Sequence, residues 1–267
     1  MREITFTCSD IAEGQKALFT MAVEGAKKQG IKASLQVSAP SLGTKAVGCW
    51  GWRRGEQLRA AGHDVLLFEN GYLGDRLKQW VSIAWNGLNG RGNFCLPDRV
   101  DETRFAENFK LEPRRADGEC IIIMGQVRGD MSLRGHDLGN WYEDLAVNLA
   151  AEYHKPVFYR PHPAGGDTKN FTPRIPLLKG DMREALEKAY LVASYNSNAG
   201  VDAVLAGVPH VAFDMGSMAW PVSGHEVYER IMPDRQRWAA ELAHCQWHAA
   251  EIAAGDYWPR MGQMLYA

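Results

Sequence analysis

The chain has 267 residues, of which 46% are hydrophobic, and its formal net charge is −2. This length is enough for a core in one large domain or two smaller ones, and the near-neutral charge gives no overall electrostatic reason to bind nucleic acid. Five cysteines without a CxxC spacing argue against a disulfide framework or a zinc site.

Hydropathy gives no sign of a membrane segment. No stretch approaches the roughly 18 consecutive apolar residues of a membrane-spanning helix. The N-terminus, Met-Arg-Glu-Ile, lacks the apolar core of a signal peptide. We therefore expect a cytoplasmic protein without a membrane span.

Strands and helices are predicted to alternate through the first part of the chain. Apolar runs predict strands at 4–8, 33–37, 46–50 and 64–68, and helical spacing predicts helices at 12–29 and within 51–62. Such alternation is typical of a parallel, Rossmann-like sheet covered by helices on both faces.

A polar stretch follows the strand predicted at 64–68. It contains Glu69, Gly71, Tyr72, Asp75 and Arg76. In parallel α/β sheets the functional crevice lies at the carboxyl ends of the strands, so these residues are candidates for a site. The alternative is a loop of turn residues with a solvated ion pair.

A further strand begins at Trp80 and leads into a loop rich in glycine and asparagine. This loop contains Asn89 and Arg91 and two Asn-Gly pairs, which favour tight turns. The same residues could instead bring the backbone close to a ligand.

A linker-like polar stretch at 112–118 precedes a second alternating region. Strands are predicted at 120–124, 157–159, 191–194 and 211–213, with helices at 141–154, 182–188 and 199–206. Residues 226–267 predict two or three more helices. We therefore expect an α/β protein with Rossmann-like domains at 1–112 and 113–225, and helices of 226–267 packing back across both.

The turn between the strand at 191–194 and the next helix is suited to an anion. Ser197 and Asn198 are small polar residues that can cap the helix, and a helix N-terminus attracts phosphate. Asp202 lies one turn further on, within reach of a sugar hydroxyl beside that phosphate. The alternative is an ordinary βαβ unit with a capped helix.

Four local patterns together resemble glycosyltransferases of the two-Rossmann (GT-B) type, and most of all the capsule-polysaccharide and Kdo transferases, with bacterial sialyltransferases as more distant relatives. The first is Gln-x-x-x-Asp-x-Ser, at Gln126, Asp130 and Ser132. The second is Arg-Pro-His-Pro, with Arg160 and His162. The other two are Glu69-Asn70-Gly71 and the block that begins at Ser197-Asn198 and continues with Asp202-Ala-Val-Leu-Ala-Gly-Val-Pro. The chain departs from the family at Asn70, where a second acid is usual, and at Asp202, where glutamate is usual.

The resemblance implies two domains that face a central cleft. The second domain would bind the donor, a UDP-, GDP- or CMP-linked nucleotide sugar, through Gln126, Asp130, Ser132, Arg160, His162, Ser197, Asn198 and Asp202. The first domain would bind the acceptor through Gly71, Tyr72, Arg76, Asn89 and Arg91. Glu69 is the first candidate for the catalytic base and Asp75 the second. No Asp-x-Asp pair follows a strand, so we expect no catalytic metal, and no cofactor besides the nucleotide sugar.

Residues 71–76 and 85–91 also resemble stretches of bacteriophage proteins. This suggests a hydroxymethylated base in phage DNA as the acceptor, and the host cytoplasm as the location. A basic aromatic face could contact DNA through Arg53, Arg54, Arg59, Arg76 and Arg91, interleaved with Trp50, Trp52, Trp80 and Trp85. In the alternative, the tryptophans belong to the core and the arginines are solvated. Other functions in view are a capsule or glycan glycosyltransferase, a nucleotide-sugar epimerase, and a non-catalytic module that binds nucleic acid or a partner.

Overall fold

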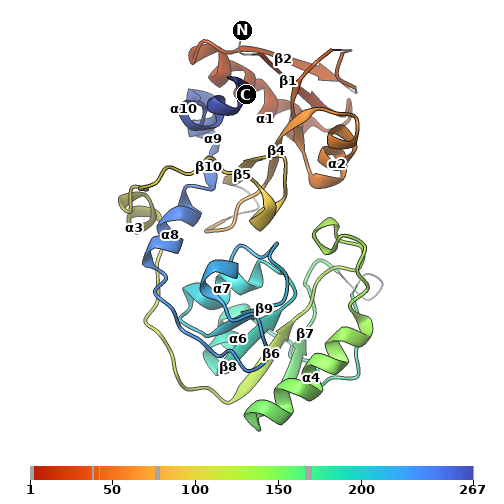
Figure 1. Ribbon diagram of the computed structural model, residues 1–267, viewed down its shortest axis with the longest axis vertical. Helices are drawn as coiled ribbons and strands as arrows, with labels where there is room; N and C mark the ends of the chain where they lie inside the picture. The colour runs from red at the N-terminus through yellow and green to blue at the C-terminus, as the bar shows by residue number, and fades with distance from the viewer. Residues whose placement is uncertain (1–2, 38, 42, 76–78, 166–169, 267) are drawn as a thin grey trace. The chain divides into compact units, whose positions relative to one another are not determined.

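A computed structural model describes residues 3–37, 39–41, 43–75, 79–165 and 170–266. The chain divides into two compact units (Figure 1). Unit 1 comprises Met1–Phe109 and Ala240–Ala267, and unit 2 comprises Lys110–Ala239. The first boundary lies close to the expected one at 112. Residues 226–267, expected as helices that pack back across both domains, are divided between the two units at Ala239 and Ala240.

Unit 1 contains a six-stranded sheet in the order β10-β5-β4-β3-β1-β2. Four strands are parallel to one another: β1 (Glu3–Cys8), β2 (Lys32–Val37), β3 (Ala46–Trp50) and β4 (Asp64–Asn70). The strand β5 (Trp80–Trp85) is antiparallel to β4, and β10 (Gln246–His248) is antiparallel to β5. The sheet is therefore mixed, where the sequence predicted a parallel one. The connection between β4 and β5 is too short for the dozen or so residues of a parallel crossover.

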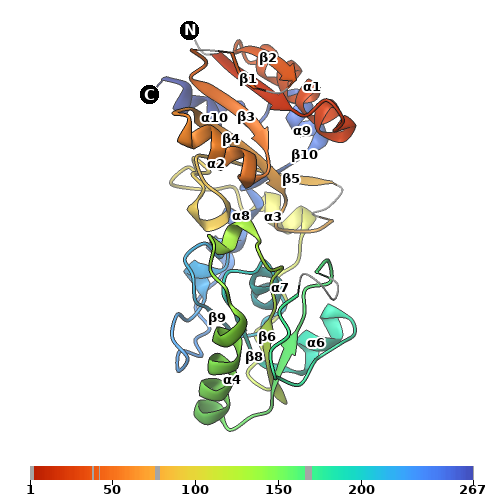
Figure 2. The same ribbon diagram turned by 90° about the vertical axis from the view of Figure 1, so that its right-hand side faces the viewer.

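Helices cover both faces of this sheet. On one face α1 (Glu13–Lys28) packs through Phe19 against Phe6 and Phe68, and Tyr257 joins these rings from the C-terminal segment. The C-terminal helices α9 (Ala249–Ala254) and α10 (Trp258–Met261) lie on the same side, with α9 against α1 (Figure 2). On the other face α2 (Trp52–Ala60) covers the apolar side chains of β3 and β4. A short helix, α3 (Thr103–Asn108), precedes the passage into unit 2.

Unit 2 contains a four-stranded sheet in the order β7-β6-β8-β9. Its strands are β6 (Cys120–Met124), β7 (Val157–Arg160), β8 (Ala189–Ser194) and β9 (His210–Ala212), and all are parallel. The helix α4 (Gly139–Tyr153) covers one face, whereas α6 (Met182–Lys188) and α7 (Ala199–Leu205) cover the other. The helix α8 (Gln236–Ala243) carries the chain back towards unit 1.

The strand register of unit 2 brings four chain segments to one edge of its sheet. Met124 pairs with both Arg160 and Ser194, and Ser194 pairs with Ala212. Because all four strands are parallel, the residues that follow these positions gather at the carboxyl edge of the sheet. We call this the carboxyl edge of unit 2.

Candidate functional site

The carboxyl edge of unit 2 collects polar side chains that are far apart in the sequence. Gln126 follows β6, Arg160 ends β7, Asn196 follows β8 and Asp214 follows β9. Every residue predicted to bind the donor lies on this edge or in the first turn of α7, which starts from it: Gln126, Asp130, Ser132, Arg160, His162, Ser197, Asn198 and Asp202.

Asn196 is the centre of a buried hydrogen-bond network on this edge. The Nε2 of Gln126 donates to the Oδ1 of Asn196 over 2.6 Å, and the backbone N–H of Asn196 donates back to the Oε1 of Gln126 over 3.1 Å. The Nδ2 of Asn196 donates to the carbonyl of Ser132 and, over 2.7 Å, to the Oδ2 of Asp214. One side chain thereby joins the segments that follow β6, β8 and β9.

The network gives Gln126 and Ser132 internal partners. Gln126 is only 5% exposed, and its amide also reaches the Oγ of Ser132 at 3.3 Å. Asp130 accepts the N–H of Ser132 over 2.8 Å, as an aspartate does in a turn. The role of Asn196 was missed in the sequence, where its only signal was its place in a run of small polar residues after a buried strand.

Arg160 and His162 follow one another out of β7. The Nε of Arg160 is buried and has no hydrogen-bond partner among the residues that the structure describes. A buried donor without a partner is costly unless a ligand supplies an acceptor. His162 accepts the N–H of Ala164 at its Nδ1 over 3.1 Å, and its backbone exchanges hydrogen bonds with the side chain of Asn170.

A buried histidine lies beneath the turn that opens α7. The ring of His210 lies between the hydroxyls of Ser194, 3.0 Å from Nε2, and Ser223, 2.7 Å from Nδ1. The hydroxyl of Ser223 donates to a carbonyl, so the Nδ1–H of His210 donates to Ser223 and Ser194 donates to Nε2. Burial lowers the pKa of His210 to about 3, so the ring is neutral at physiological pH. Gly200 touches this ring, and a Cβ there would lie 2.4 Å from it.

The first candidate base, Glu69, lies inside β4, because this strand extends to Asn70, two residues beyond the expected end. Glu69 is half-buried, and its Oε1 accepts the N–H of Asn70 over 3.1 Å. Its charge acts on the buried thiol of Cys49, whose pKa is raised to about 12 chiefly by burial. Asp75, the second candidate, is exposed. Arg76, predicted to bind the acceptor, lies outside the described residues.

Gly71 and Tyr72, predicted to bind the acceptor, are packed inside unit 1. Tyr72 is 4% exposed, meets the ring of Phe94 edge-on at 6.1 Å, and has its pKa raised by burial. A Cβ on Gly71 would lie 2.7 Å from the Cβ of Trp80, so glycine is needed there for close packing. The apolar pair Tyr72-Leu73 was a signal for a core position.

Asn89 and Arg91 were also predicted to bind the acceptor. They lie beside the start of β4, at the opposite end of this strand from Glu69. They follow β5, whose last residue pairs with Leu66 near the start of β4, whereas Asn70 pairs with Val81. Four residues of strand separate these two ends of β4, a distance of about 13 Å. The expectation that these residues share one site with Glu69 is therefore corrected. It assumed a parallel strand, and β5 runs the other way.

Part of the proposed basic aromatic face belongs to the interior of unit 1. Trp85 is 1% exposed, and its Nε1 donates to the carbonyl of Met261 over 3.0 Å. Trp80 packs against Phe109. Arg59 pairs with Asp64 at 3.6 Å. At least Trp85 belongs to the core, as the alternative interpretation held.

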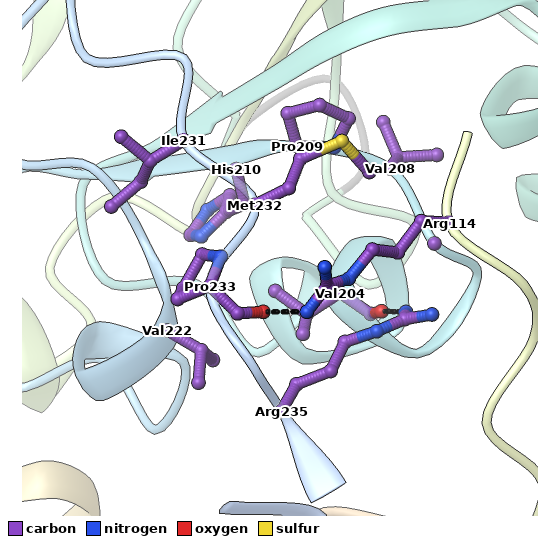
Figure 3. A pocket seen from close by; sticks show the side chains of 11 residues that line it. Arg114, Val204, Val208, Pro209, His210, Val222, Ile231, Met232, Pro233 and Arg235 are labelled. Atoms are coloured by element: carbon purple, nitrogen blue, oxygen red, sulfur yellow. Dashed lines mark hydrogen bonds between the residues drawn. The ribbon is translucent and has the colours of Figure 1, made fainter. Parts of the chain in front are cut away.

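A small cavity in unit 2 lies at the other end of its sheet, between the C-terminus of α7 and the start of β9 (Figure 3). Its volume is about 20 Å³, which is room for about one water molecule. Arg114 donates to the carbonyl of Pro233 over 2.8 Å, and Arg235 donates to the carbonyls of Val204 and Glu112. These contacts anchor the two chain segments that enter and leave unit 2, and the cavity is too small for a nucleotide.

In the part of the chain that the structure describes, no group of three or more His, Cys, Asp or Glu side chains could hold a metal ion. Within the same residues, no helix combines the length and the apolar character needed to traverse a bilayer.

Comparisons with known proteins identify the fold. No family model matches the chain, and no curated protein does. Among solved structures, the chain is similar to KpsC of Thermosulfurimonas dismutans, described as a β-Kdo 2,4 transferase, with a TM-score of 0.62, 14% identity, and 90% of this chain and 89% of that chain covered. A second KpsC structure from that organism, described as a β-Kdo 2,7 transferase, gives a TM-score of 0.58 and 15% identity over 95% and 97% of the two chains. The chain thus has a two-domain, Rossmann-like GT-B fold.

Proposed function

We propose that the protein is a glycosyltransferase that moves a sugar from a nucleotide-sugar donor to a hydroxyl acceptor. The observation that carries the proposal is the gathering of the eight predicted donor residues at the carboxyl edge of unit 2 and in the first turn of α7. The GT-B fold, shared over nearly the whole length with two Kdo transferases, supports it.

Arg160 and the turn at Ser197 and Asn198 are assigned to bind the donor phosphate. As the sugar leaves, negative charge builds up on the phosphate, and preorganised cations and N–H donors stabilise it. Arg160 offers a permanent charge, and its buried Nε lacks a protein partner among the described residues. The Asn196 network keeps the loops around this turn in one arrangement. Asp202 is assigned to a sugar hydroxyl.

Glu69 is assigned as the base that removes the proton of the acceptor hydroxyl. Its carboxylate takes the proton of the acceptor hydroxyl, the hydroxyl oxygen forms the bond to the sugar carbon, and the bond from that carbon to the phosphate oxygen breaks. Asn70 stands where the resembling family has a second acid, so Asp75 is the alternative base. The chemistry as proposed uses no metal.

Donor binding is the first test. Titration with UDP-, GDP- and CMP-sugars is expected to reveal one class that binds wild type. The variant Arg160→Ala should weaken this binding by about 10- to 100-fold, the value of a charge-assisted hydrogen bond. Arg183→Ala, in the exposed part of α6, is the matched control and should bind as wild type does. The proposal is refuted if no nucleotide sugar binds, or if the two variants behave alike.

The acceptor is tested in two arms with the donor that binds. One arm offers glycans, including Kdo-terminated ones, and the other offers DNA that contains hydroxymethylated bases. Transfer of labelled sugar in either arm identifies the acceptor class, and addition of EDTA is expected to leave the rate unchanged. Release of free sugar without an acceptor would instead indicate an epimerase. Tight DNA binding without any nucleotide response would indicate a non-catalytic module.

A further inference from the structure

The backbone that follows Glu69 is held by a side chain from the far end of the chain. The Oε1 of Gln246, in β10, accepts the N–H of Tyr72 over 2.7 Å and that of Leu73 over 2.9 Å. Its Nε2 donates to the carbonyl of Leu73 over 3.3 Å. Gln246 is completely buried, so all three hydrogen bonds are shielded from water.

The same glutamine is aligned with the candidate base across three strands. Ser82 in β5 pairs with Glu69 on one side and with Gln246 on the other, so the three side chains lie on one face of the sheet. The hydroxyl of Ser82 donates to the carbonyl of Glu69 over 3.3 Å. The hydroxyl of Tyr72 also hydrogen-bonds Ser82. Hydrogen bonds from Ser82 in β5 and from Gln246 in β10 thereby hold the end of β4 and the residues after it.

The close approach of Gln246 also explains the glycine at position 71. A Cβ on Gly71 would lie 2.9 Å from the Oε1 of Gln246. The N–H of Gly71 donates to the carbonyl of Trp80, which sets where the chain leaves β4. A larger residue would push the loop off the amide that holds it.

Gln246 is itself held in place by Arg104. The guanidinium of Arg104 donates to the carbonyl of Gln246 over 2.8 Å and pairs with both carboxylate oxygens of Glu251. It lies 5.7 Å from the ring centre of Trp80 and 5.0 Å from that of Trp247. A charge that is paired and lies close to two aromatic rings gives the glutamine a rigid support.

We propose that Gln246 is a positioning residue for the reaction, which sets the orientation of Glu69 through the backbone of residues 70–73. This inference rests on the proposed function, because it takes Glu69 as the base. A glutamine suits the task since its amide accepts two N–H groups and donates to a carbonyl at once. Glutamate can accept both N–H groups but cannot donate, and methionine can do neither.

Two variants of the full chain test the proposal. Gln246→Met should speed hydrogen exchange at the amides of Tyr72 and Leu73 by at least tenfold, and should lower the kcat of transfer by at least tenfold. Gln246→Glu should keep exchange at both amides within about threefold of wild type and recover most of kcat. Both variants should bind the donor as wild type does, because the donor residues belong to unit 2.

Ile252→Val, a buried change in the same C-terminal segment, is the control for general loss of stability. The proposal is overturned if Gln246→Met leaves amide exchange unchanged, or if it raises exchange but lowers kcat no more than Ile252→Val does. If Gln246→Met does not fold, a kcat for Gln246→Glu below a tenth of that of wild type also overturns it. Absence of donor binding to wild type would refute the proposed function instead, and the exchange result would still report on the loop.

Discussion

Glu69 and Asp75 are the two candidates for the proposed base, and they differ in their exposure to solvent. Glu69 is half-buried at the end of a strand, whereas Asp75 is exposed. We expect Glu69→Gln to lower kcat by about 10²- to 10⁴-fold, the usual contribution of a general base, without a change in donor affinity. Asp75→Asn should change kcat less than tenfold. Steady-state kinetics of both variants with the identified acceptor check this, and the reverse order would move the role to Asp75.

Asn196 should tolerate very little change, because both its donor and its acceptor are used. In Asn196→Asp the new carboxylate would face that of Asp214 across a contact that measures 2.7 Å with the amide. We expect a loss of about 2–4 kcal/mol in the free energy of unfolding at pH 7, and a smaller loss at pH 4, where one carboxyl takes up a proton. Asn148→Asp on the exposed face of α4 should change stability by less than about 0.5 kcal/mol. Denaturation at the two pH values measures both.

His210 makes stability depend on pH in a direction set by its burial. Its pKa is lowered from 6.5 to about 3 in the folded protein, so between these values only the unfolded chain binds the proton. The free energy of unfolding should therefore fall as the pH drops from 6.5 towards 3, by up to about 1.4 kcal/mol per pH unit. His210→Gln should flatten this slope, whereas His154→Asn, at an exposed position, should not. Equal slopes in all three proteins would contradict the prediction.

At the scale of the helix, α1 offers two glycines with opposite surroundings. A Cβ on Gly25 would lie 2.3 Å from the carbonyl of Ile252 in α9, whereas nothing lies within 4 Å of one on Gly14. We expect Gly25→Ala to destabilise the protein by about 1–3 kcal/mol, because α9 must move away. Gly14→Ala should stabilise it by up to about 1 kcal/mol through helix propensity. Thermal unfolding of the pair provides the measurement, and similar midpoints would mean that α9 does not pack there.

Local sequence patterns predicted most of the helices and strands of the structure. The strand at 46–50 and the strand at 120–124 have the predicted bounds, and the helix at 12–29 is shorter by one residue at each end. Such segments are recognised because apolar periodicity and glycine punctuation act within a few residues. Elements of the last third were less well predicted. β10 has only three residues, too few to show any period.

At the scale of the whole molecule, the two units differ in how their chains are built. Unit 2 is one continuous segment, whereas unit 1 needs residues 240–267. A protein that ends at Ala243 keeps α8 but loses β10, α9 and α10, and with them the buried rings of Trp247, Tyr257 and Trp258. Large aromatic side chains dominate core energetics, so we expect unit 1 to unfold and unit 2 to stay folded.

Hydrogen exchange followed by peptide mass spectrometry measures whether each unit stays folded in the truncated protein. Peptides from 120–212 should keep their protection in the truncated protein, and peptides from 3–70 should lose it. A fragment of residues 110–239 is the control and should show a cooperative unfolding transition of its own. Retained protection in 3–70 would mean that the C-terminal segment is dispensable for the fold of unit 1.

The sequence by itself determined the α/β class, the alternation of most helices and strands up to β9, and the edge of unit 2 where the candidate donor residues gather. It could do so because helical crossovers make neighbouring strands parallel, and parallel strands present all their carboxyl ends at one edge. Only the tertiary structure decided the reversed direction of β5, the burial of Tyr72 and Trp85, and the contact of Gln246 with residues up to 174 positions away. Those features depend on which distant segments meet, and no local period carries that information.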